Sequence, residues 1–80
     1  MLLSLITPDK QIFEGEIKSI TLPGTDGSFE ILNNHASLIS SLAKGEVKIT
    51  SDSAIEKYTI DGGVVEVLNN KVIVLAEALV

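Results

Sequence analysis

The chain has 80 residues, which is enough for one domain and too few for a second hydrophobic core. It has 11 Asp and Glu residues against 6 Lys residues, with no Arg, and its net charge is −5. This balance argues against a nucleic-acid-binding or phosphate-binding protein. The absence of Cys excludes disulfides and thiolate metal sites.

The N-terminus carries no basic charge ahead of its apolar residues, unlike a signal peptide. The longest uninterrupted apolar run is residues 72–76. It falls far short of the roughly 20 residues that a membrane-spanning helix needs. We therefore expect a protein that is soluble or peripheral to a membrane.

Apolar residues recur mainly at every second position, which places alternate side chains on opposite faces of a β-strand. Val47 and Ile49 alternate with polar residues, and Phe29 and Ile31 flank Glu30. Val, Ile and Thr are abundant, as is typical of strands. The pattern predicts an all-β fold. The expected strands, in chain order, are residues 2–6, 11–22, a short strand around 29–31, another within 35–43, and then 46–51, 55–60, 64–68 and 71–77.

Turn residues separate these strands because Pro presets φ, whereas Gly and Asn tolerate positive φ. The predicted turns are Pro8-Asp9-Lys10, the segment from Pro23 to Gly27, Lys44-Gly45, Asp52-Ser53, Asp61-Gly62-Gly63 and Asn69-Asn70. The first Gly-containing segment lacks the Lys-Ser/Thr ending of a phosphate loop. We interpret Gly62-Gly63 as a hairpin turn with close backbone approach.

The long second strand changes phase, since Ile17 and Ile20 are three residues apart. We expect a bulge near Lys18 and Ser19 that carries the strand from one sheet to the other. The predicted fold is a flattened two-sheet β-sandwich of about eight to ten short strands. It forms a single domain over residues 1–80.

His35 is the only histidine and the only side chain that ordinarily titrates near neutral pH. Asp26, Glu30, Ser37 or Ser40 could partner it in a small hydrolase or acid/base enzyme. No Gly-x-Ser-x-Gly motif occurs, and one His without Cys is a poor set of zinc ligands. We therefore favour a structural or contact role, with no catalytic, cofactor or metal site.

Several strands carry aliphatic residues on both faces, including Leu2, Ile6, Ile20 and Leu22. A two-sheet core would explain this pattern, and so would an exposed apolar patch that binds a partner. The composition leaves both explanations open.

Five segments together resemble one family, although each is weak alone. They are Leu5-Ile6-Thr7-Pro8 with Phe13-Glu14-Gly15, residues 22–37, residues 42–49, residues 60–67, and Leu75-Ala76-Glu77-Ala78. In this order and spacing the chain resembles the N-terminal β-sandwich domain of the epsilon subunit of F-type ATP synthases. Three positions depart from the family pattern: Glu30 replaces Gly, and Asn33 and Ser37 each replace Pro.

The resemblance implies a non-catalytic rotor subunit of the central stalk, without a cofactor, that links the gamma subunit to the polar loops of the membrane c ring. It would support ATP synthesis driven by proton or sodium flow, on the cytoplasmic side of a bacterial inner membrane. The implied c-ring contacts are Asp26, Ser28, Glu30, Asn33, Asn34 and His35. The implied gamma contacts are Thr7, His35 and Ser40. The alternative is a free-standing β binding module for another protein.

Family members commonly continue into two C-terminal helices that restrain ATP hydrolysis and in some cases bind ATP. The sequence ends at Leu79-Val80, where such a segment would begin. We therefore expect no C-terminal helical domain, no inhibitory function and no ATP binding.

Overall fold

The computed structural model describes residues 1–80 as seven β-strands joined by short turns, without a helix. No segment therefore provides the long apolar helix that could cross a membrane. The predicted all-β class is confirmed. The strands are β1 (Leu2–Ile6), β2 (Gln11–Glu16), β3 (Ser19–Gly24), β4 (Gly27–Leu32), β5 (Leu38–Thr50), β6 (Ile55–Leu68) and β7 (Lys71–Ala76).

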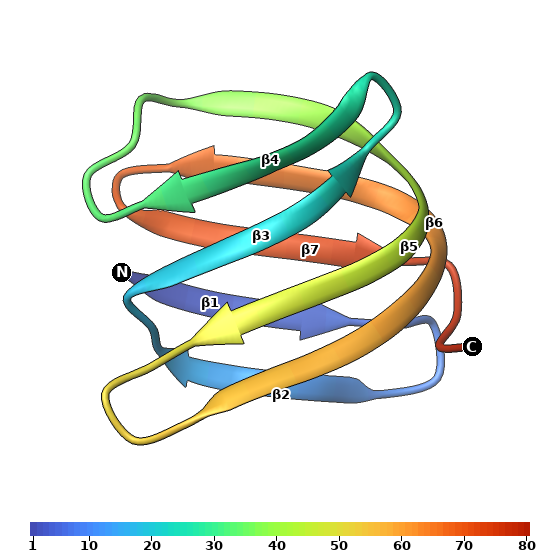
Figure 1. Ribbon diagram of the computed structural model, residues 1–80, viewed down its shortest axis with the longest axis horizontal. Coiled ribbons are helices and arrows are strands. Elements are labelled where there is room, and N and C mark those ends of the chain that lie inside the picture. Colours follow the sequence, from blue (N-terminus) through green and yellow to red (C-terminus); the bar gives the residue numbers. More distant parts are fainter.

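The seven strands form one continuous hydrogen-bonded sheet, in the order β2-β1-β7-β6-β5-β3-β4, that is folded over into two layers (Figure 1). Neighbouring strands are antiparallel except for β1 and β7, which are parallel. The long strands β5 and β6 curve around one side of the molecule from one layer into the other. The first half of β5 and the second half of β6 share a layer with β7, β1 and β2. Their remaining halves share the other layer with β3 and β4, so the predicted sandwich is confirmed.

The β5–β6 hairpin keeps one register along its whole length, from Leu38↔Val67 to Thr50↔Ile55. Pairing is interrupted only at the bend, between the pairs on either side of Gly62. Because the register is unbroken across the bend, residues 38–50 form one strand and residues 55–68 form another. The sequence predicts two short strands in each place and one strand over residues 11–22, which is instead divided into β2 and β3. The observed number is therefore seven, instead of about eight to ten.

The bend explains why the predicted turn at Gly62 and Gly63 is wrong. Gly62 has a φ of +106°, and a Cβ there would lie 2.5 Å from Oε2 of Glu77. A Cβ on Gly63 would collide with the carbonyl oxygen of Leu75 in the neighbouring strand. The two glycines therefore allow the close backbone approach that the sequence predicts, but within a continuous strand.

The predicted turn at Lys44-Gly45 is also absent, because these residues lie inside β5. The β3–β5 register runs from Thr21↔Lys48 to Gly24↔Leu42, so six steps along β5 match three along β3. A Cβ on Gly45 would lie 2.7 Å from Cβ of Pro23. Here the glycine accommodates an irregular bend against β3 instead of a chain reversal.

The chain crosses between the layers at Ile17 and Lys18, next to the position where the sequence predicts a bulge. The Ile17 N–H donates to the Met1 carbonyl at 2.8 Å, and the Lys18 N–H donates to the Thr50 carbonyl at 2.7 Å. These two consecutive amides therefore bond to opposite layers, one to the residue before β1 and the other to the end of β5. The segment breaks into two strands, β2 and β3, at opposite sides of the sheet order.

The core lies between the layers and contains 16 buried apolar residues, drawn from both of them. Each aliphatic side chain removed from water in this way contributes about 1.5–3 kcal/mol. Ile20 and Leu22 belong to this core, so the two-sheet explanation holds for them. The fully buried large residues are Leu3, Leu5, Ile20, Leu22, Ile31, Val47, Ile49, Ile60, Val65, Val67, Val72 and Val74.

Candidate interaction surface

His35 lies in the exposed loop between β4 and β5, without the partners that catalysis would need. Its Nδ1 is 2.7 Å from the carbonyl oxygen of Ala36. A carbonyl can only accept, so Nδ1 carries the proton in this contact. No hydrogen bond or ion pair joins the ring to Asp26, Glu30, Ser37 or Ser40. Nor does any group of three His, Cys, Asp or Glu side chains come close enough to hold a metal ion.

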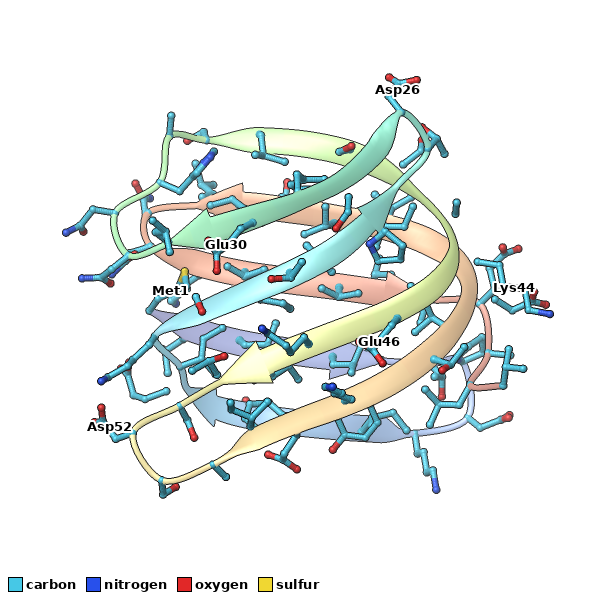
Figure 2. All side chains as sticks on the ribbon, viewed as in Figure 1. Met1, Asp26, Glu30, Lys44, Glu46 and Asp52 are labelled. Carbon is cyan, nitrogen blue, oxygen red and sulfur yellow. The ribbon has the colours of Figure 1, made fainter.

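Three c-ring candidates lie along the outer side of β4 and the turn that precedes it. Asp26 is at the tip of the β3–β4 turn, and Glu30 projects from the middle of β4 (Figure 2). Ser28 and Glu30 are exposed, whereas the intervening Phe29 packs against the core and Ile31 is buried in it. Neither Asp26 nor Glu30 forms an ion pair within the chain, so both carboxylates are free to meet a charged partner.

Asn33, Asn34 and His35 lie beyond the opposite end of β4, in the exposed segment 33–37. A strand of this length spans about 20 Å, so the structure does not bring Asp26 together with His35. The six candidates form a line along one edge of the sandwich and are not a compact cluster.

The gamma candidates are more widely separated. Thr7 is only 8% exposed, and its hydroxyl donates to the Lys10 carbonyl at 3.2 Å within the β1–β2 turn. Ser40 is half-buried on β5, where its hydroxyl is 3.4 Å from the Ser41 carbonyl. Thr7 follows the end of β1 that pairs with Leu75, away from the β6–β7 turn beside His35. These three residues therefore do not form one site.

The structure also has an exposed apolar surface, which the sequence predicts only as one of two possible explanations. The outer side of β1, β5, β6 and β7 carries aliphatic residues in adjacent cross-strand positions. For example, Ile39 and Ile73 both pair with Glu66, and Leu75 pairs with Val64. Ile39, Leu68 and Leu75 are 73%, 53% and 52% exposed. We call this surface the outer apolar face; its members are Leu2, Ile39, Val64, Leu68, Ile73 and Leu75.

Three shallow depressions adjoin on this face, of about 190, 240 and 340 Å³. The first two share Lys71 and Ile73, and the second and third share Glu66 and Leu68. Small-molecule sites are usually single, deep clefts of about 300–1,000 Å³. Two of these hollows are smaller than that, and the third is the most open to solvent. A row of small hollows among exposed aliphatic residues suits the side chains of a protein partner better.

The signal for this face is in β7, where aliphatic residues occupy every position from Val72 to Ala76. Val72, Val74 and Ala76 are buried, whereas Ile73 and Leu75 are exposed. Only the fold shows that no other layer covers the second face. Leu2 is exposed on that face, so the two-sheet core does not account for it.

Comparison with known proteins shows which family has this fold and sequence. The family model "ATP synthase, Delta/Epsilon chain, beta-sandwich domain" matches residues 1–80. The chain belongs to this family. The ATP synthase epsilon chain of Chlorobium limicola is 42% identical over 76 residues, which cover 94% of this chain and 86% of that protein. The epsilon chain of Campylobacter jejuni is 43% identical over 79 residues, covering 98% of this chain and 61% of that protein.

Two solved structures share the fold of this chain closely. One comes from the mitochondrial ATP synthase central stalk and c ring of Tetrahymena thermophila, with a TM-score of 0.85 and 25% identity. The other comes from the OSCP/F1/c-ring structure of the Euglena gracilis enzyme, with a TM-score of 0.90 and 25% identity. They align with 99% and 98% of this chain, which spans 64% and 51% of theirs. The family predicted from the sequence motifs is confirmed.

Proposed function

We propose that this β-sandwich is a rotor component of an F-type ATP synthase, placed in the central stalk between the gamma subunit and the c ring. The family match over all 80 residues carries the proposal. It is supported by the likeness to two structures that contain a central stalk or a c ring. In this role the domain is not catalytic. It transmits rotation of the ring to the stalk, while ATP is made on other subunits.

The outer apolar face is the surface that we assign to the gamma subunit. Its six exposed aliphatic side chains lie together on one layer, where a partner could remove them from water. His35 lies in the loop that precedes β5. Ser40 follows Ile39 on β5 but pairs with the buried Val65, so its side chain points away from this face. Thr7 is buried in its own turn, so its side chain is the least suited of the three to contact gamma.

The edge formed by the β3–β4 turn and β4 is the surface that we assign to the c ring. Asp26 and Glu30 present unpaired carboxylates there, and Ser28 lies between them. Asn33, Asn34 and His35 extend this edge with exposed polar groups. Negative charge at this edge would attract basic groups of the ring loops and fix the register of the contact. The domain would then be held peripherally at the cytoplasmic side of a bacterial inner membrane by the complex.

The test is recovery of the complex from native membranes through an affinity tag on this chain. We expect the gamma and c subunits to be recovered with wild type and with Ile55→Asp. Ile55 is exposed but lies at the β5–β6 turn, outside the outer apolar face. Leu75→Asp should reduce recovery strongly, because it places a charge among the exposed aliphatic residues of the proposed contact.

Recovery of folded wild-type chain without gamma or c subunits would overturn the proposal and favour a free-standing binding module. A catalytic turnover by the isolated domain that is lost in His35→Ala would instead favour an enzyme. Equal recovery of the subunits with Leu75→Asp and Ile55→Asp would agree with membership of the complex. It would refute the assignment of the outer apolar face to the gamma subunit.

A further inference from the structure

Asn70, in the turn between β6 and β7, joins segments that are far apart in the sequence. Its side-chain Oδ1 accepts from the backbone N–H of Asn34 at 2.8 Å. Its Nδ2 donates to Oδ1 of Asn33 at 2.9 Å. Its backbone carbonyl accepts from the N–H of Leu2 at 3.2 Å. One residue therefore connects the β4–β5 loop, the β6–β7 turn and the start of β1.

The two side-chain bonds fix the orientation of the Asn70 amide. If the Asn70 amide were rotated by half a turn, its NH₂ group would face the N–H of Asn34. Both groups are donors, so no hydrogen bond could form. The backbone supports this arrangement, because Asn34 and Asn70 have φ of +63° and +60°. Asn tolerates this left-handed region better than most residues, and its short side chain can then bond nearby backbone.

The β4–β5 loop has few other attachments. Within residues 33–37, the remaining hydrogen bonds are from the His35 N–H to the Leu32 carbonyl at 3.1 Å, and between the His35 ring and Ala36. Both are internal to the loop and its adjoining strand. The two bonds from Asn70 are therefore the ones that tie this loop to another part of the sandwich.

We infer that Asn70 is a positioning residue, which holds Asn33, Asn34 and His35 in a fixed place at the edge where the domain meets its partners. The identity of those partners rests on the proposed function. A loop held before binding does not have to be ordered during binding, so the encounter should be faster and the complex tighter. Asn70 itself need not contact the partner for this effect.

The first test measures amide hydrogen exchange by NMR in the whole chain. Asn70→Gly removes the side chain and keeps a residue that tolerates positive φ. Exchange of the Asn34 amide should then become roughly three- to tenfold faster, as expected for the loss of a hydrogen bond. Asn70→Asp retains an oxygen that can accept from Asn34, so protection should be largely restored.

Asn69→Gly is the matched control, because Asn69 is the neighbouring turn residue with a φ of +50° and forms no side-chain hydrogen bond. It should leave exchange of the Asn34 amide unchanged. Amides of the buried residues Val65 and Val74 report on global unfolding and should exchange equally in both glycine variants. Equal protection of Asn34 in Asn70→Gly and Asn69→Gly would overturn the inference.

The second test measures reassembly of the chain with the gamma–c-ring complex of its own organism. Asn70→Gly should lower the association rate several-fold relative to Asn69→Gly, and Asn70→Asp should recover it. If Asn70→Gly speeds exchange of the Asn34 amide but does not slow assembly, Asn70 does not prepare the loop for partner binding. If wild type does not bind this complex at all, the proposed function fails, while the exchange experiment still decides whether Asn70 holds the loop.

Discussion

Gly63 and Ala76 pair across β6 and β7 so closely that a Cβ on Gly63 would lie 3.0 Å from the Cα of Ala76. The same Cβ would collide with the carbonyl oxygen of Leu75. Both obstacles are backbone atoms of a paired strand, so neither can move aside without loosening the sheet. We expect Gly63→Ala to lower the free energy of unfolding by about 1–3 kcal/mol, measured by urea or thermal denaturation.

Gly15→Ala is the control for this substitution. The nearest atoms to a Cβ there belong to the Phe13 ring, at 3.8 Å, an ordinary contact distance. Since alanine restricts the unfolded chain, we expect Gly15→Ala to be neutral or stabilising by up to about 1 kcal/mol. Equal stability of the two variants would contradict the close packing of Gly63.

Alanine substitutions at Leu22 and Leu75 should affect different properties, the first stability and the second partner binding. Leu22 is fully buried between the layers, so Leu22→Ala should cost about 2–5 kcal/mol of unfolding free energy. Leu75 is half-exposed on the outer apolar face, so Leu75→Ala should cost less than about 1 kcal/mol. Binding to gamma, measured by reconstitution, should instead fall with Leu75→Ala. A Leu75→Ala variant that binds normally would show that this side chain is outside the contact.

Tyr58 should make stability depend on pH in the alkaline range. Partial burial raises the pKa of the Tyr58 hydroxyl above its ordinary value of about 10, and the nearby Glu56 raises it further. The hydroxyl donates to Oε1 of Glu56 at 3.1 Å, a bond that only the protonated phenol can make. The folded state thus holds this proton more tightly than the unfolded state. Its contribution to stability is complete below pH 10 and is lost as pH rises through the raised pKa.

The check compares thermal unfolding of wild type and Tyr58→Phe across this range. Within this range, the difference in Tm between the two proteins should change with pH only above about pH 10. Because Tyr58 is the only tyrosine, its ultraviolet absorbance reports the titration directly. In Glu56→Gln the measured pKa should move back toward the ordinary value. A tyrosine that titrates equally in folded and unfolded protein would refute the expected shift.

Glu30 should influence how fast the domain finds the c ring. Glu30→Lys reverses an exposed, unpaired charge on β4, and should slow association several-fold at low salt. The effect should fade at high salt, because ions screen exposed charges. Glu46→Lys makes the same change in net charge on β5, away from the proposed edge (Figure 2). If the two variants assemble at the same rate, Glu30 has no specific role.

Much of the fold follows from alternation and turn chemistry. Phe29 and Ile31 face inward around an exposed Glu30, as the alternation predicts. Asn69 and Asn70 adopt the positive φ expected of a tight hairpin turn. These features depend on neighbouring residues alone, and local sequence therefore contains the information.

The long strands could not be predicted in the same way. Glycine is typical of turns, but the glycines at positions 45, 62 and 63 lie inside strands. Each leaves room for an atom of a distant segment, which belongs to Pro23, Glu77 and Leu75 respectively. Glycine marks both a reversal and a close approach, and only the three-dimensional partner distinguishes them. The same limit applies to the candidate surface. Neither the exposure of one face of β7 nor the bonds from Asn70 to residues 33 and 34 can be inferred without the fold.

The uninterrupted register of β5 and β6 has a consequence for how the domain bears load. In many sandwiches two separate sheets are joined mainly by side-chain packing, so one sheet can slide over the other. Here two strands of 13 and 14 residues belong to both layers and keep their ladder on either side of the bend. A twisting force applied to one layer therefore passes into the other along peptide bonds and paired hydrogen bonds. The domain should turn, and unfold, as one piece.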